Sequence, residues 1–351
     1  MADGSFTVVG AAGGSGAAVR LRKVSVDSPG LSRRRAGKGY VFLDPQGRRV
    51  TDPEVIARCK ALVIPPAWRE VWICPDPAGH IQAVGLDDAG RRQYLYHEVW
   101  RQRRERAKYR HVLEVAARLP DARGQVVEHL ALPRLVREQA LAIAFRLLDR
   151  GAFRIGGQTY AARHETYGLA TLRKDHLRIT GDGTLVFEYR AKSGMPRYLE
   201  LRDEDLTAPL TTLRRRRGGG VELLAYRNGR GWADLSTADI NAYIKELLGA
   251  DASAKDFRTW HGTVLAAVTL ARAEDVATAR KRQAAVREAV KRVAEDLGNT
   301  PAVSRASYID PQVIDAFERG HTIPPDAAAP GEVEVRTGLA PAEQAVLDLL
   351  S

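Results

Sequence analysis

The side chains in this sequence that are best suited to chemistry are its basic ones. The 351 residues include 54 lysines and arginines against 43 acidic residues, a formal net charge of +11. Ten of the basic residues are lysines and 44 are arginines, and a guanidinium can hold two phosphate oxygens at once. This composition favours a polyanionic partner, with nucleic acid first among the candidates. Charge alone also fits a protein that only needs solubility.

Motifs of several common enzyme classes are missing from the sequence. It contains no G-x-x-x-x-G-K-[S/T] phosphate loop, no H-E-x-x-H zinc motif and no Ser–His–Asp spacing. The glycines of FRIGG, residues 153–157, are misplaced for a dinucleotide fingerprint. Cys59 and Cys74 form no C-x-x-C pair and the eight histidines do not cluster. We therefore expect no metal site and no cofactor.

Four segments of the chain follow one another in an order that is typical of one family. They are residues 153–176 (FRIGGQTYAARHETYGLATLRKDH), 186–194 (VFEYRAKSG), 255–263 (KDFRTWHGT) and 298–310 (GNTPAVSRASYID). Together they resemble the catalytic domain of type IB DNA topoisomerases, above all the compact poxvirus and bacterial branch. Residues 64–85 and 90–97 resemble the small DNA-clamping domain of that branch, so the resemblance covers about residues 38–325. It implies an isomerase that nicks and reseals duplex DNA.

The resemblance also implies which residues are catalytic. The nucleophilic tyrosine falls on Tyr308, the two catalytic arginines on Arg154 and Arg258, and the general-acid lysine of a β-hairpin on Lys192. The fifth position falls on Asn299, where the poxvirus and eukaryotic pattern has histidine and the bacterial branch often has asparagine. An asparagine amide can donate to a phosphate oxygen, but it cannot donate as a cation.

These residue types fit transfer of a phosphoryl group to a phenol. The transition state carries charge on the non-bridging oxygens, and two guanidiniums can neutralise it as Mg²⁺ does elsewhere. A phenol, with an unperturbed pKa of about 10, needs nearby cations to become a good nucleophile. The phosphotyrosyl bond conserves the energy of the broken bond, so resealing requires no ATP. Lys192, assisted by Arg154, is the candidate proton donor to the leaving 5′-oxygen.

Each of these residues has a plainer interpretation when it is taken alone. Tyr308 fits a packed surface aromatic, Lys192 a solvated hairpin residue, Arg154 a charge beside an amphipathic helix and Asn299 a helix C-cap. Their joint occurrence favours the catalytic interpretation. His261, three residues after the second arginine, is interpreted as a structural residue near a helix start because the resemblance assigns it no chemistry.

A second group of residues is expected to contact DNA outside the reaction centre. By the resemblance, Gln93, Tyr94 and Tyr96 enter the major groove, where glutamine can pair with adenine and tyrosine can contact thymine methyls. Tyr94 and Tyr96 alternate along a strand and share one face, so a place in the core is the alternative. Further DNA contacts are expected at four positions: Arg91, Arg92, Tyr160 and Lys255.

The expected function is relaxation of supercoiled duplex DNA through a 3′-phosphotyrosyl intermediate and strand rotation, without ATP or metal. A tyrosine recombinase uses nearly the same chemistry, but recombinases usually carry histidine where this sequence has Lys255. A DNA-binding protein without catalysis is the third alternative, and the competent residues at all five catalytic positions argue against it. We expect a monomer in the bacterial cytoplasm, at the nucleoid. No stretch approaches the roughly 18 apolar residues that cross a membrane.

The strands and helices that the sequence pattern indicates around these residues predict an α+β fold. A small N-terminal antiparallel-sheet domain is followed by a larger, mostly helical catalytic domain with a small β-sheet. The expected boundaries are 1–35 for a disordered basic tail, 36–98 for the DNA-clamping domain, 99–118 for a basic hinge, 119–325 for the catalytic domain and 326–351 for a C-terminal tail with a short helix.

Hydrophobic periodicity predicts the catalytic domain's main elements. One helix is expected to end at Gly151 as its C-cap, and residues 177–192 fit two strands joined by a Gly-Asp-Gly turn. Three more helices are expected over 239–248, 262–273 and 277–297. The last of these places apolar residues on one face and stops at the Gly-Asn-Thr-Pro run after residue 297.

Overall fold

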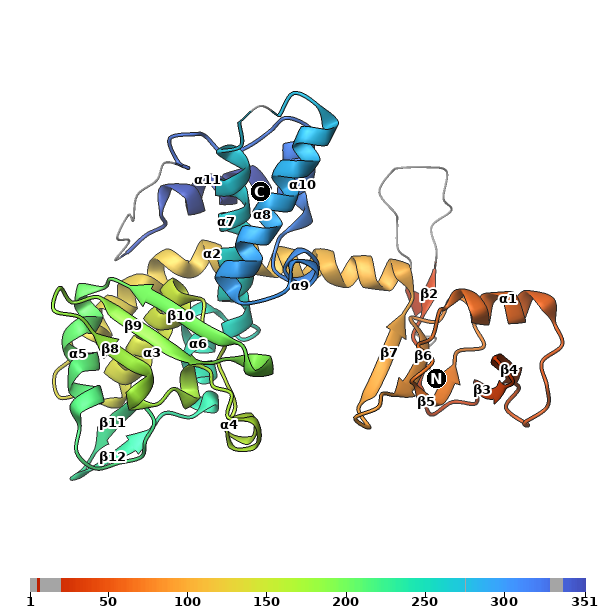
Figure 1. Ribbon diagram of the computed structural model, residues 1–351, viewed down its shortest axis with the longest axis horizontal. Helices are drawn as coiled ribbons and strands as arrows, with labels where there is room; N and C mark the ends of the chain where they lie inside the picture. Colours follow the sequence, from red (N-terminus) through yellow and green to blue (C-terminus); the bar gives the residue numbers. More distant parts are fainter. Residues whose placement is uncertain (1–4, 7–19, 275, 329–336) are drawn as a thin grey trace. The chain divides into compact units, whose positions relative to one another are not determined.

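The computed structural model describes residues 5–6, 20–274, 276–328 and 337–351 (Figure 1). The chain divides between Lys108 and Tyr109 into two compact units, which are described separately. Antiparallel strands dominate the first unit, and helices with small sheets make up the second, so the α+β prediction is confirmed. Within the described ranges, no helix is long and apolar enough to cross a membrane.

The first unit is built on a five-stranded antiparallel sheet in the order β4-β3-β5-β6-β7. Its strands are β3 (Leu31–Ala36), β4 (Gly39–Leu43), β5 (Arg69–Ile73), β6 (Ile81–Leu86) and β7 (Arg92–Tyr96). Two short strands, β1 (Ser5–Phe6) and β2 (Leu21–Arg22), pair with each other. Helix α1 (Pro53–Ala61) begins at Asp52, whose carboxylate accepts from two backbone N–H groups. Its Cys59 joins Phe42, Ile73 and their neighbours in a small core.

The basic N-terminal segment is more ordered than its composition predicts. Residues 31–35, assigned to the disordered tail, form most of β3 and pair with both β4 and β5. Arg33 donates to the carbonyls of Ile64, Pro65 and Trp68, and its guanidinium lies 4.2 Å from the Tyr40 ring centre. Strand pairing satisfies the backbone whatever the side chains are, so an arginine-rich run can lie in a sheet. Tail residues 1–4 and 7–19 lie outside the described residues, whereas 5–6 and 20–30 are described.

The predicted basic hinge is one continuous helix. Helix α2 (Glu98–Leu130) runs through residues 99–118 without a break. Its basic positions between 101 and 106 are exposed, whereas from Tyr109 onward it buries Val112, Val115 and Ala116 in the core of the second unit. The second unit therefore begins about ten residues earlier than the expected start at residue 119.

The second unit surrounds helix α3 (Arg137–Gly151), which is buried over most of its length. A three-stranded antiparallel sheet packs beside it, with β9 (Leu185–Arg190) between β8 (Leu177–Ile179) and β10 (Pro196–Leu201) (Figure 1). β11 (Ala225–Asn228) and β12 (Gly231–Asp234) form a separate hairpin. The remaining helices are α4 (Gln158–His164), α5 (Glu204–Arg215), α6 (Thr237–Leu248), α7 (Ala254–Ala271), α8 (Ala279–Leu297), α9 (Pro301–Ser307), α10 (Pro311–Glu318) and α11 (Pro341–Leu350), with short 3₁₀ turns η1 (Leu169–Thr171), η2 (Lys174–His176) and η3 (Lys192–Gly194).

Helix α3 ends differently from the prediction. Gly151 is its last helical residue, and Ala152 takes the left-handed conformation at φ 47° and ψ 36°. A Cβ on Gly151 would lie 2.4 Å from the Phe153 ring, so glycine is needed there for close packing. The cap moves to an alanine, at a cost of about 1 kcal/mol. Packing of Phe153 thus decides which residue turns the chain.

The C-terminal segment is part of the second unit rather than a tail. Helix α11 packs on α7 and buries Val346 completely. Its Glu343 pairs with Arg123 of α2 at 2.7 Å and accepts from Trp260 Nε1 of α7 at 3.0 Å. The same arginine donates twice to Asp149 of α3, at 2.8 Å each. One buried guanidinium therefore joins three helices.

Candidate active site

Two arginines meet at the C-terminal end of α8. Arg154, which follows α3, donates to the carbonyls of Leu297 at 3.4 Å and Gly298 at 3.1 Å. Arg258 of α7 donates to the same Leu297 carbonyl at 2.9 Å and to Ala152. The last carbonyls of a helix have no partner within the helix and form the negative end of its dipole. The end of α8 therefore holds two like charges side by side.

The two guanidiniums perturb each other. Arg258 is 4% exposed, and burial together with the charge of Arg154 lowers its pKa to about 10. Burial, and more weakly the charge of Arg197, also lowers the pKa of Arg154. Arg258 thus keeps its proton at neutral pH. Its hydrogen-bond acceptors on the described chain are two backbone carbonyls and the hydroxyl of Tyr308, which are all neutral, so the pair offers net positive charge to an anion.

Asn299 adds a neutral donor to this pair. It follows Gly298, the left-handed cap of α8 at φ 59°, and its N–H donates to the Ala294 carbonyl at 2.8 Å. Its Oδ1 accepts from Arg154, and a guanidinium can only donate, which fixes the orientation of the amide. The Nδ2 group is then buried without a partner among the described residues. An unmet buried donor costs about 1–3 kcal/mol, and an anion oxygen would satisfy it.

The tyrosine lies directly after α9. The N–H of Tyr308 donates to the Ser304 carbonyl at 2.9 Å, and its half-buried ring has its centre 5.2 Å from Cζ of Arg258. Helix α7 holds this segment closely, because a Cβ on Gly262 would lie 2.5 Å from the Tyr308 carbonyl oxygen. The Asp310 N–H donates to the Thr263 hydroxyl at 3.1 Å. Gly262 is thus a positioning residue that the sequence interpretation missed.

Lys192 belongs to a different element from the other four predicted catalytic residues. It begins η3, the turn between β9 and β10, and its side chain is exposed. Within the described part of the chain it makes no hydrogen bond or ion pair. The structure therefore brings together Arg154, Arg258, Asn299 and Tyr308, and leaves the lysine on a hairpin turn.

His261 lies inside α7 and not near a helix start as predicted, and its ring joins two helices. Its Nε2 lies 2.9 Å from Asp296 Oδ2, which joins α7, about one turn after Arg258, to α8, one residue before Leu297. Burial opposes ionisation of Asp296, but the hydrogen bond with His261 and the charges of His261, Arg197 and Arg258 lower its pKa overall. The Asp296 carboxylate thus lies in the residue next to Leu297, whose carbonyl accepts from both arginines.

The predicted groove-reading tyrosines are on the surface of the first unit. Tyr94 is 39% exposed and Tyr96 46% exposed, and their rings stack with centres 5.9 Å apart. Leu95 between them packs against the core of that unit. The alternative that the tyrosines belong to the core is therefore wrong, and the strand presents a flat aromatic pair to its surroundings.

The remaining predicted contact residues differ in how free they are. Gln93 Nε2 and Arg91 both donate to Asp87, at 2.9 and 2.8 Å. The side chain of Arg92 is exposed, as is that of Lys255 in the first turn of α7. Tyr160 is in α4, and its side chain lies outside the described residues.

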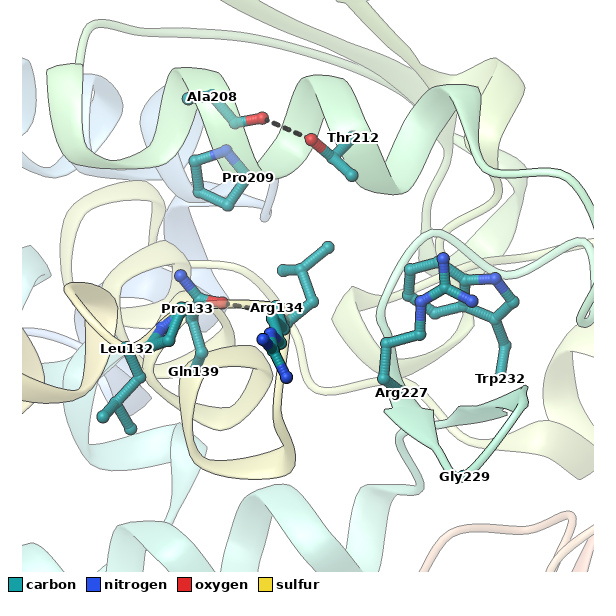
Figure 2. A pocket seen from close by; sticks show the side chains of 11 residues that line it. Leu132, Pro133, Arg134, Gln139, Ala208, Pro209, Thr212, Arg227, Gly229 and Trp232 are labelled. Atoms are coloured by element: carbon teal, nitrogen blue, oxygen red, sulfur yellow. Dashed lines mark hydrogen bonds between the residues drawn. The ribbon is translucent and has the colours of Figure 1, made fainter.

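A pocket of the second unit lies elsewhere. It has a volume of about 650 Å³ and lies between residues 132–135, α5 and the β11–β12 hairpin (Figure 2). Arg227 stacks on Trp232 at 4.2 Å on one side, and Gln139 lies on the other (Figure 2). None of its lining residues belongs to the arginine site. A backbone phosphate of an extended polymer does not require a deep pocket, so pocket size does not mark the reaction centre.

Comparison with known proteins shows which family models and relatives match this chain. The model of the eukaryotic DNA topoisomerase I catalytic core matches residues 97–319, a span that contains all five predicted catalytic residues. The model of the bacterial DNA topoisomerase IB N-terminal domain matches residues 39–87. The DNA topoisomerase 1B of Acanthamoeba polyphaga mimivirus is 25% identical over 295 residues, which cover 82% of this chain and 88% of that protein. Residues 91–96, which include the predicted groove readers and phosphate contacts of the first unit, fall between the two model matches.

Proposed function

Since this chain belongs to the type IB DNA topoisomerase family and is therefore an isomerase that acts on DNA, we propose that it relaxes supercoils through a 3′-phosphotyrosyl intermediate. One strand is cut, the free end rotates about the intact strand, and the cut is resealed. The observation that carries this proposal is the arginine pair at the end of α8, with Asn299 on one side and Tyr308 over Arg258.

The arginine pair binds the scissile phosphodiester. Its non-bridging oxygens accept from Arg154, Arg258 and the unmet Nδ2 donor of Asn299. Charge grows on these oxygens in the transition state, so donors that are already fixed stabilise it without reorganisation. The helix end and the Ala152 carbonyl hold the donors in place before DNA arrives. The chain thus supplies the positive charge that a metal ion supplies in other phosphoryl-transfer enzymes.

Bond making and bond breaking follow from these positions. The Tyr308 oxygen attacks phosphorus, its proton passes to water, and the bond between phosphorus and the 5′-oxygen breaks. Lys192 gives a proton to that 5′-oxygen. Because this lysine is on an exposed turn, its side chain is free to reach the cut when DNA is bound. In the reverse step the 5′-hydroxyl attacks the phosphotyrosine and regenerates Tyr308, so no ATP is consumed.

The first unit completes the proposal. Tyr94 and Tyr96, with Gln93 beside them, contact base edges in the major groove, and Arg91 and Arg92 contact phosphates. The exposure of the stacked tyrosines supports this role. We further propose that the protein acts as a monomer on duplex DNA in the bacterial nucleoid.

Trapping with denaturant tests the nucleophile. Wild-type protein mixed with labelled duplex should give a covalent protein–DNA adduct, and Tyr308→Phe should give none while it still binds the duplex. An adduct that persists in Tyr308→Phe would refute the assignment. Relaxation of a generic plasmid in the same preparation separates this function from a recombinase, which would exchange strands at defined sites.

The general acid is tested separately. Lys192→Ala should slow cleavage by about 10²–10⁴-fold, the usual range for proton transfer. A duplex whose scissile 5′-oxygen is replaced by sulfur has a leaving group that needs no proton, so cleavage by the variant should recover. Equal slowing on both duplexes would show that Lys192 acts in another way.

A further inference from the structure

Arg197 is a basic residue beside the arginine pair that the mechanism above does not use. It lies on β10, directly across from Tyr189 on β9. A Cβ placed on Gly298 would lie 4.0 Å from Nη1 of Arg197 and 4.0 Å from Nη1 of Arg154. Two guanidiniums from different elements therefore border the same point, at the residue that caps α8.

This separation suits a shared phosphate. The two Nη1 atoms are at most twice 4.0 Å apart, since each lies that far from one point. A nitrogen that hydrogen-bonds to a phosphate oxygen at about 2.9 Å lies roughly 4 Å from the phosphorus. One phosphate can thus accept from Arg154 and Arg197 together.

Arg197 lies close enough to the arginine pair for its charge to reach both guanidiniums. Its charge contributes to the lowered pKa values of Arg154 and Arg258, after burial in each case. Its guanidinium also bonds to the hydroxyl of Tyr189, whose pKa is raised because burial outweighs the nearby cations. Three guanidiniums that repel one another are a costly arrangement unless a polyanion joins them.

Arg197 has no ion-pair partner among the described residues, although its charge reaches the Asp296 carboxylate. In the described part of the chain no carboxylate lies within 4.0 Å of it in an ion pair, and its side chain is half-buried rather than solvated. Tyr189 offers only a neutral hydroxyl. By contrast Arg202, the residue directly after β10, is exposed and pairs with Asp182 at 2.9 Å.

We propose that Arg197 is a third phosphate-binding guanidinium of the active site, and that it contacts the scissile phosphodiester beside Arg154. This inference rests on the proposed function of the site. Asn299 supplies a donor there but no charge, so Arg197 supplies the third fixed positive charge. Tyr189 positions it from the neighbouring strand.

Single-turnover cleavage by the full chain tests the contact. Arg197→Ala should slow covalent adduct formation by about 10²-fold, the lower range for loss of one transition-state donor, and Arg197→Lys should recover part of that loss. In a Tyr308→Phe background, Arg197→Ala should lower the slope of log Kd against log[salt] by about one. Arg202→Ala removes the same charge nearby and should leave the cleavage rate within about twofold, as expected of a surface ion pair.

A neutral substrate separates contact from structure. When a methyl group replaces one non-bridging oxygen of the scissile phosphate, the penalty of Arg197→Ala should shrink to less than threefold for at least one of the two diastereomers. An equal penalty on charged and methylated duplexes would overturn the proposal, as would an unaffected rate. If wild-type protein forms no adduct, the proposed function falls and this inference with it. A wild-type adduct with an unaffected Arg197→Ala variant overturns this inference alone.

Discussion

Asn299 offers the sharpest test of the site, because two substitutions differ in whether they keep the acceptor that now bonds to Arg154. Asn299→Ala removes both the Oδ1 acceptor that holds Arg154 and the unmet Nδ2 donor. Asn299→Asp keeps an acceptor for Arg154 and strengthens that bond by charge, but it also removes the donor. If the amide served only to hold the arginine, the aspartate variant would be the better enzyme.

The proposed site predicts the opposite order. Loss of one preorganised donor slows a reaction of this kind by about 10²–10³-fold, which is the expectation for Asn299→Ala. The aspartate adds a negative charge next to the phosphate. At about 5 Å and an effective dielectric constant of about 20, the repulsion is about 3 kcal/mol. Asn299→Asp should therefore cleave roughly 10²-fold more slowly than Asn299→Ala.

Rapid quenching of a labelled duplex at saturating protein measures this order, because saturation separates the cleavage rate from the affinity. Asn228→Asp adds the same charge at an exposed hairpin position of the second unit and should cleave like wild type. An Asn299→Asp variant that matches or exceeds Asn299→Ala would refute phosphate contact by Nδ2. It would leave Asn299 as a holder of Arg154.

Three further predictions concern other parts of the molecule. Glu343→Gln should destabilise the second unit by about 2 kcal/mol and lower Tm by about 4–8 °C. Burial opposes ionisation of Glu343, but the hydrogen bond from Arg123 lowers its pKa overall. The stabilisation is therefore present above the unfolded pKa of about 4.3 and is lost as pH falls through the lower pKa of the folded protein. A Tm difference that is the same at pH 7 and pH 3.5 would contradict it. DNA should raise the pKa of Arg258 from about 10, so calorimetry in two buffers near pH 10 should show proton uptake that is smaller in Arg258→Gln. Replacing either Tyr94 or Tyr96 by alanine should weaken duplex binding about tenfold with an unchanged Tm, since both rings are exposed; equal affinity would argue against groove contact.

Elements with a strong local pattern could be predicted from the sequence. Helix α8 has its apolar face at Val286, Val290, Val293 and Leu297 and its left-handed cap at Gly298, so both its type and its end were predictable. Helix α7 begins at Ala254, eight residues before the predicted start. Its first turn is set by Ser253, whose N–H and hydroxyl both donate to the Asp256 carboxylate, and such a cap is a weaker signal in the sequence than hydrophobic periodicity.

Features decided by tertiary packing could not be predicted. The cap of α3 is at Ala152 because Phe153 fills the space above Gly151, and no local rule prefers alanine in that conformation. The position of Arg197 depends on the strand register that pairs it with Tyr189, and a shift of one residue would turn it to the other face. The order of the motifs predicted which residues are catalytic, whereas the bonding of both arginines to the Leu297 carbonyl is visible only in three dimensions.

Because both arginines bond to the Leu297 carbonyl, the length of α8 sets where the groups of the reaction centre lie. Inserting or deleting one residue within a helix rotates everything beyond it by about 100° and shifts it by about 1.5 Å. In α8 such a change would move the common acceptor of both arginines, together with Asn299. The same change before Ala279, ahead of the helix, would leave the relation among these groups intact. Homologous chains should therefore vary in length ahead of α8 and keep a constant count from its last turn to the tyrosine.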